Sequence, residues 1–147
     1  MPELRQNIIT REWVIIATER ARRPDEFVRP KKTIDPAPAF DPGCPFCPGN
    51  ESMSAAETYR IGDREGWKVR VVGNKFPALS REGDRVRRID GVYRSMSGVG
   101  FHEVVVEHRR HDLSPALYSV EDLTNILGAY RQRYKQMKED PRVEAII

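Results

Sequence analysis

The prolines of this chain are concentrated in one stretch, and that stretch limits what the first third of the molecule can fold into. Seven of the 11 prolines lie between Pro24 and Pro48. Proline fixes its backbone φ and has no N–H to donate, so neither a helix nor an inner strand can run through so dense a set. We therefore expect an extended loop from residue 24 to residue 48.

The only two cysteines of the chain, Cys44 and Cys47, stand near the end of this loop with two residues between them. Two thiolates at this spacing can bind one face of a tetrahedral zinc ion, and imidazoles can complete the site. A redox dithiol normally opens a helix, and Pro48 and Gly49 argue against a helix there. Two incidental cysteines are a third possibility. A disulfide-stapled secreted domain is disfavoured because the chain starts with charged residues and not with an apolar signal. The spacing favours a metal site.

Composition narrows the class of protein. Apolar residues make up 39% and charged residues 32% of the 147 residues, and the net charge is +3. A chain of this length can bury the core of one domain, and no apolar run approaches the length of a membrane span. Neither a helix-turn-helix pattern nor an aromatic-interleaved basic surface is visible. We expect a cytoplasmic globular protein that contacts neither membranes nor nucleic acid.

One dense group of cations stands out in the proline-rich region. Arg20, Arg22 and Arg23 lie almost side by side in the sequence, with further basic residues at 29, 31 and 32. A guanidinium can bind a phosphate through two parallel hydrogen bonds, so the group suits a phosphorylated ligand. The alternative is a solvated loop edge with no ligand.

Several segments have the pattern of β-strands. The β-branched runs 6–10 and 12–17 bracket Arg11 and predict a hairpin. Apolar residues alternate over 67–72, with the apolar side at 67, 69 and 71, and 100–107 also reads as a strand. Residues 51–66 are ambiguous, and residues 81–94 are typical of a weak hairpin or a loop. We expect the first hairpin and the strands at 67–72 and 100–107 to form one antiparallel sheet.

One helix is predicted from residue 119 to residue 138. Ser119 with Asp122 three residues later resembles a capping box. Apolar residues then recur at spacings of three and four, so we expect the stripe Leu123, Leu127, Tyr130 and Tyr134 to pack on a sheet face. Together with the strands this predicts an α+β fold.

The last residues, 142–147, alternate as a strand does and end on Ile146 and Ile147. An alternating run normally leads to a turn and another element, so we expect this chain to be a portion of a longer protein with residues 1–147 as an incomplete domain. A short edge strand at a natural C-terminus is the alternative.

Four segments occur in an order that resembles one family: RARRP at 20–24, CPFCPGNE at 44–51, VVGNKFPAL at 71–79 and GFHEVVVE at 100–107. Together they resemble the N-terminal half of galactose-1-phosphate uridylyltransferase, a branch of the histidine-triad superfamily. The resemblance extends from about residue 5 to the end of the chain, and it implies a histidine-triad-like half-domain.

The resemblance implies a zinc site. Cys44 and Cys47 fall on the zinc cysteines of the family and His111 falls on its third ligand, while the fourth is a histidine further along. Such a zinc ion holds loops together, so its role is structural.

The resemblance also implies a nucleotide-sugar cleft. Arg20 and Arg23 match paired arginines near the sugar phosphate, and Asn74 with Lys75 matches the loop that receives the uridine nucleotide. Lys75 departs from the acidic residue of some relatives, which puts its own role in doubt.

The family's reaction proceeds through a covalent intermediate. A histidine attacks the α-phosphorus of UDP-glucose and releases glucose-1-phosphate, and galactose-1-phosphate then takes the uridylyl group. The family nucleophile lies in a His-Pro-His motif, but His102, His108 and His111 are the only histidines here and none lies in such a motif. His102 is on a predicted strand and His108 is expected to be a solvated turn residue. We therefore expect the nucleophile beyond Ile147 and no activity from this chain alone. The resemblance also implies a homodimer for the full-length protein.

Two other functions stay open. One is a relative that transfers adenylyl groups from an ADP-sugar or phosphorolyses it, since the residues present do not separate uridine from adenine. The other is a zinc-stabilised binding module without chemistry of its own.

Overall fold

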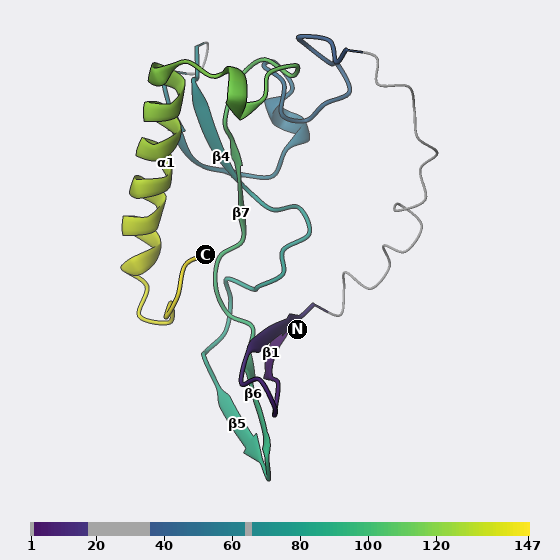
Figure 1. The fold of residues 1–147 in the computed structure, drawn as a ribbon, viewed down its shortest axis with the longest axis vertical. Helices are drawn as coiled ribbons and strands as arrows, with labels where there is room; N and C mark the ends of the chain where they lie inside the picture. Colours follow the sequence, from purple (N-terminus) through teal and green to yellow (C-terminus); the bar gives the residue numbers. More distant parts are fainter. Residues whose placement is uncertain (1, 18–35, 64–65) are drawn as a thin grey trace. The chain divides into compact units, whose positions relative to one another are not determined.

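The computed structural model describes residues 2–17, 36–63 and 66–147. Its elements, shown in Figure 1, are β1 (Glu3–Gln6), β2 (Trp13–Ile16), η3 (Glu51–Met53), β3 (Glu57–Ile61), β4 (Val69–Gly73), β5 (Arg87–Asp90), β6 (Tyr93–Ser97), β7 (Glu103–Val106), η4 (Pro115–Leu117) and α1 (Val120–Lys138). Antiparallel sheets with one main helix confirm the predicted α+β class. Within the described ranges, no helix is long and apolar enough to cross a membrane.

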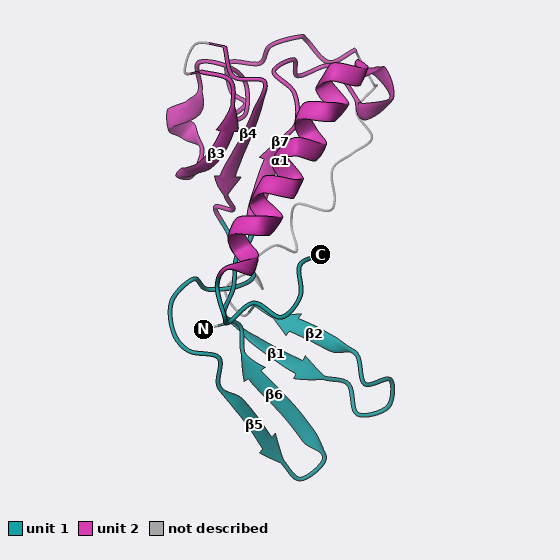
Figure 2. Cartoon of the chain, turned by 90° about the vertical axis from the view of Figure 1, so that its left-hand side faces the viewer, with its two compact units in different colours: residues 1–30, 76–102, 140–147 teal, residues 31–75, 103–139 magenta. Residues whose placement is uncertain are grey.

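The strands form two sheets, and the chain divides into two compact units (Figure 2). Unit 1 contains residues 1–30, 76–102 and 140–147, and its sheet has the order β2-β1-β6-β5. Unit 2 contains residues 31–75 and 103–139, and its sheet has the order β3-β4-β7. The prediction that the first hairpin shares a sheet with β4 and β7 was therefore wrong, because β1 takes β6 as its second partner.

The predicted hairpin of unit 1 is confirmed, but its first strand ends earlier than expected. Residues 7–12 form the turn, although Ile8 and Ile9 favour strands. The Asn7 side chain explains this difference, since its Oδ1 accepts hydrogen bonds from the backbone N–H groups of Ile9 (2.9 Å) and Thr10 (3.2 Å). An asparagine that binds the backbone two residues ahead favours a turn over a strand. The segment 81–94, which was predicted to be a weak hairpin or a loop, contributes to a second hairpin, formed by β5 and β6.

The core of unit 2 is built around β4, the central strand of its sheet. Val69 and Val71 are 1% and 0% exposed and pack with Ile126 and Ala129 of α1. The predicted alternation exposes one face of this strand, yet Arg70 and its neighbours are also buried. A central strand covered on both sides loses the alternation that marks a half-exposed strand. The ambiguous segment 51–66 contains η3 and a strand, β3, which pairs with β4.

Helix α1 begins as predicted and packs differently. Ser119 Oγ accepts from the N–H of Asp122 (3.1 Å) and the Asp122 carboxylate accepts from the N–H of Ser119 (3.0 Å), which completes a capping box. The predicted packing stripe is 41–65% exposed, comprising Leu123, Leu127, Tyr130 and Tyr134. Ile126 and Ala129 face the sheet instead. The apolar arc of the helix is wider than one face, and the small Ala129 side chain, 0% exposed, is the part of it buried against Val69 and Val71 of β4.

The predicted strand at 142–147 is not formed. Residues 141–142 are in a turn and residues 143–147 have no regular secondary structure. Arg142 binds the Asp140 carboxylate (2.7 Å) and donates to the carbonyls of Arg81 (3.0 Å) and Gly83 (2.8 Å). An alternating sequence becomes a strand only beside a partner strand, and no strand in the described part of the chain pairs with this run.

Candidate metal centre

The loop that carries the cysteines is held by a succession of tight turns. The N–H of Cys44 donates to the carbonyl of Asp41 (3.1 Å), that of Cys47 to Cys44 (3.3 Å), and that of Asn50 to Cys47 (3.1 Å). Gly49 has a φ of 89°, a conformation that residues with a Cβ rarely adopt. These turns bring the two cysteines to the same side of the loop without help from a helix or a sheet.

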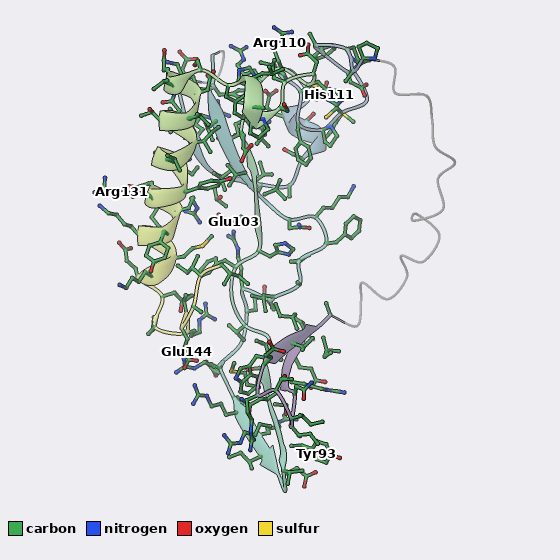
Figure 3. All side chains as sticks on the ribbon, viewed as in Figure 1. Tyr93, Glu103, Arg110, His111, Arg131 and Glu144 are labelled. Atoms are coloured by element: carbon green, nitrogen blue, oxygen red, sulfur yellow. The ribbon has the colours of Figure 1, made fainter. Side chains whose placement is uncertain are left out.

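His111 reaches the same place from a distant part of the sequence. It lies in the loop that follows β7, where Figure 3 labels it beside Arg110. Its backbone N–H donates to the carbonyl of Ala39 (2.9 Å), which ties this loop to the start of the cysteine loop. Its Nδ1 atom lies 3.6 Å from Cys47 Sγ. One ligand atom from each of Cys44, Cys47 and His111 lies within 4.8 Å of the others.

This donor set fits a metal ion. Two sulfurs and one imidazole nitrogen are ligands that zinc prefers, whereas magnesium and calcium prefer oxygen. Both cysteines are free, so no disulfide competes for them. The three predicted ligands are therefore brought together in an arrangement compatible with zinc.

The environment of Cys47 argues against the redox alternative. Its side chain is 2% exposed, and burial raises the pKa of the Cys47 thiol. Reactive dithiols need a lowered pKa, which a helix N-terminus or a nearby cation supplies. Cys44 and Cys47 instead lie in turns ahead of η3. A metal ion would remove the proton that burial otherwise retains on Cys47.

A polar network lies directly after the cysteine loop. The indole N–H of Trp67 donates to Glu51 Oε1 (2.9 Å), and the Arg70 guanidinium lies 5.4 Å from the centre of the Trp67 ring. Arg70 also donates to Glu57 (2.8 Å) and to Ser54 Oγ (3.0 Å). Burial opposes ionisation of Glu51, but the Trp67 bond, backbone N–H groups and the charge of Arg70 together outweigh it, and the pKa of Glu51 is lowered. The network anchors the segment 51–57 to β4.

Sequence reasoning missed this network, although one signal was present. Arg70 interrupts the apolar run of β4, and a charge inside a strand that is otherwise buried needs a partner. Two glutamates precede it in the ambiguous segment 51–66, but nothing in their spacing says that they reach β4.

Two of the four predicted nucleotide-binding residues are described by the structure. Asn74 and Lys75 follow the last residue of β4, where Asn74 is half-buried and Lys75 is exposed. Arg20 and Arg23 lie outside the described residues. The proposed cleft of these four residues therefore stays a prediction.

The remaining two histidines use their Nδ1 atoms as hydrogen-bond acceptors. His102 lies just before β7, not in it, and accepts from the N–H of Ala78 (2.9 Å). His108 accepts from the N–H of Arg110 (2.9 Å), and its ring stacks on Tyr118 with the centroids 5.2 Å apart. The expectation that His108 is solvated was wrong, because this stacking leaves its side chain 18% exposed.

The comparison with known families identifies the chain. The model of the galactose-1-phosphate uridyl transferase N-terminal domain matches residues 1–147. This chain belongs to that family. An ADP-glucose phosphorylase from Arabidopsis thaliana is 36% identical over 148 residues, which cover 99% of this chain and 42% of the relative. The chain thus spans less than half the length of this relative.

Solved structures of the family share the fold. A crystal structure of an ADP-glucose phosphorylase from Arabidopsis thaliana with bound ADP-glucose matches with a TM-score of 0.59 and 31% identity, over 99% of this chain and 41% of that chain. A uridylyltransferase structure matches with a TM-score of 0.60 and 26% identity, over 94% of this chain and 37% of that chain. These matches confirm the resemblance to the N-terminal half of the family.

Proposed function

We propose that this chain forms the zinc-stabilised N-terminal portion of a nucleotidyltransferase that acts on nucleotide sugars, with an ADP-sugar as the favoured ligand. The observation that supports this proposal best is the 36% identity to an ADP-glucose phosphorylase over 99% of the chain. The structure of such a protein with bound ADP-glucose has 31% identity, against 26% for a uridylyltransferase. In phosphorolysis the acceptor of the adenylyl group is inorganic phosphate.

A hexose-1-phosphate uridylyltransferase is the second candidate. It is favoured by the family description, galactose-1-phosphate uridyl transferase, whose model matches all 147 residues. In that case UDP-glucose and galactose-1-phosphate are the substrates. The two candidates share a nucleotidyl transfer and differ in the base and in the acceptor.

The proposed role of zinc is to hold the cysteine loop against the loop after β7. Cys44, Cys47 and His111 supply three ligands, and a further ligand completes the tetrahedron. A loop rich in proline forms few backbone hydrogen bonds of its own, so a metal ion is an effective way to hold it. When bound, zinc contributes structure and takes no part in nucleotidyl transfer.

Binding of the nucleotide sugar is assigned to Asn74, Lys75, Arg20 and Arg23. The arginines offer paired donors for phosphate oxygens, and Asn74 offers an amide for the nucleoside. Covalent transfer needs a histidine nucleophile, and no histidine of this chain lies in a His-Pro-His motif. We expect residues 1–147 to bind nucleotide sugar weakly and to leave it intact.

Titration calorimetry of residues 1–147 with ADP-glucose and with UDP-glucose tests the proposed ligand. Tighter binding of ADP-glucose supports the first candidate, and tighter binding of UDP-glucose supports the second. Asn74→Ala and Lys75→Ala should weaken binding, whereas Lys138→Ala, which removes an exposed lysine at the end of α1, should not. If neither nucleotide sugar binds, the third possible function, a zinc-stabilised binding module without chemistry of its own, is the better supported one. Turnover by this chain alone would contradict the assignment of the nucleophile.

Elemental analysis tests the metal. Protein purified without chelators should contain about one zinc per chain, and Cys44→Ser should lose it. Wild-type protein that contains no zinc after purification without chelators, and that melts at the same temperature as Cys44→Ser, would contradict the zinc site.

A further inference from the structure

The side chain of Asn50 is directed into the loop that carries the cysteines (the cysteine loop, residues 39–50) and does not cap the helix that follows it. Asn50 is the N-cap residue of η3, a position where asparagine normally accepts a hydrogen bond from the first turn. Its side chain forms no such bond. Instead, Nδ2 points back into the cysteine loop and donates to the carbonyls of Asp41 (3.2 Å), Pro42 (3.1 Å) and Cys44 (2.8 Å).

The geometry makes full use of a primary amide. The amide nitrogen carries two hydrogens and faces three carbonyl oxygens, so at least one hydrogen is shared between two acceptors. A carboxylate of the same shape has no donor and would place negative charge against those carbonyls. A serine hydroxyl has only one donor and a shorter reach. Among side chains of this size, the site therefore selects asparagine.

The three carbonyls belong to the turn that orients the cysteines. The carbonyl of Asp41 also accepts from the N–H of Cys44, and the N–H of Asp41 donates to Cys47 Sγ at 3.4 Å. The carbonyl of Cys44 also accepts from the N–H of Cys47. Asn50 thus binds backbone groups that hold both sulfur-bearing residues, from a position three residues after Cys47.

We propose that Asn50 is a positioning residue for the metal: its amide sets the separation and direction of the Cys44 and Cys47 sulfurs before the ion binds. This inference rests on the zinc site of the proposed function. Hydrogen bonds around the ligands of a metal commonly change its affinity by 10–100-fold. A purely structural role in the loop would change stability without changing the coordination of the ion.

Asn50→Asp is the direct test, because it keeps the shape and removes the two donors. Asn7→Asp is a matched control, since Asn7 uses its oxygen as the acceptor in its turn and a carboxylate preserves those bonds. Asn50→Ser is a second variant that is neutral and can cap η3, in case the added charge prevents folding. Each protein is loaded with Co²⁺, whose visible absorption reports tetrahedral sulfur ligation, and zinc affinity is measured by competition with a chelator. Far-UV circular dichroism checks the fold.

We expect the zinc dissociation constant of Asn50→Asp to rise by about 10–100-fold, with weaker or shifted cobalt bands. The zinc dissociation constant of Asn50→Ser should lie between those of Asn50→Asp and the wild type, and that of Asn7→Asp should equal the wild-type value. Equal zinc affinity and an unchanged cobalt spectrum in both Asn50 variants would overturn the positioning role and leave the zinc site intact. A wild-type chain that binds neither ion would overturn the zinc site itself, and this inference with it.

Discussion

Truncation of Arg70 to alanine should strongly destabilise unit 2. The Arg70 side chain is 1% exposed and belongs to β4, the central strand of its sheet. It donates two hydrogen bonds, to Glu57 and Ser54, and lies over the Trp67 ring. Removing one partner of a buried ion pair costs about 3–5 kcal/mol, because the other partner remains without compensation.

Two observations place the expected loss of stability at the lower end of this range, at about 3 kcal/mol. Glu57 keeps a second partner, Arg60, and its side chain is 25% exposed. Arg70 Nη1 is buried without a hydrogen-bond partner among the described residues and lies 4.0 Å from Glu51. An unsatisfied donor already lowers the contribution of Arg70 to stability, so its removal recovers part of the loss.

Urea denaturation followed by tryptophan fluorescence, to which the buried Trp67 contributes, and by circular dichroism measures this loss. With a slope of about 2 kcal/mol per M, the midpoint of Arg70→Ala should fall by about 1.5 M. Arg60→Ala is the control, because it removes the other, more exposed partner of the same glutamate, and it should cost about 1 kcal/mol. A loss for Arg70→Ala no greater than that for Arg60→Ala would refute the reasoning from burial.

The destabilisation caused by Arg70→Ala should depend on pH, and the pKa of Glu57 fixes the direction of that dependence. Hydrogen bonding by Arg60, together with Arg70, holds the pKa of Glu57 below its ordinary value of 4.5. A lowered pKa in the folded state means that the carboxylate contributes stability above pH 4.5 and loses this contribution as the pH falls through the lowered value. The difference between the wild type and Arg70→Ala should therefore narrow as the solution becomes more acidic than pH 4.5.

Three further predictions concern single positions in unit 2. Ser119→Ala removes half of the capping box and should cost about 1 kcal/mol in urea denaturation, whereas Thr124→Ala inside α1 should cost less. Gly62→Ala should destabilise by more than about 1 kcal/mol, because φ is 99° and the new Cβ would lie 2.7 Å from a backbone oxygen; Gly49→Ala, where only φ is unfavourable, should cost less. The bond from the Tyr130 hydroxyl to Glu107 raises the pKa of Tyr130 to about 12, so an ultraviolet titration of the wild type should show a late ionisation that Tyr130→Phe lacks. Since the pKa is raised in the fold, this stabilisation is present below pH 10 and is lost as the pH approaches 12, and Tyr130→Phe should remove that dependence.

The sequence alone identified the local features whose physical cause is local. The capping box at Ser119 depends on two side chains three residues apart, and the helix formed where the pattern predicted it. The proline-rich stretch predicted an irregular loop for the same reason, since φ and the missing N–H are properties of each proline. Its described part, residues 36–48, contains neither helix nor strand, while residues 24–35 lie outside the described residues. The order of four short motifs was enough to indicate the family, because this order does not depend on the residues between the motifs.

Strand partners could not be read from the sequence in the same way. The first hairpin and the strand at 103–106 have similar apolar patterns, yet they belong to different sheets. The pattern of a strand reports which face is buried and not which strand lies beside it. The strand predicted from the alternating run at 142–147 was wrong for the same reason, since the pattern does not supply a partner strand.

The tertiary structure alone decided how the three candidate metal ligands are brought together. His111 is 64 residues from Cys47 in the sequence, and the structure brings Nδ1 to 3.6 Å from the sulfur. Asn50 and Arg70 act through bonds to the backbone and to side chains that no spacing rule connects. Residue types and spacings determine which groups can bind a ligand, but distance and direction decide which of them do, and those depend on how the whole of unit 2 packs.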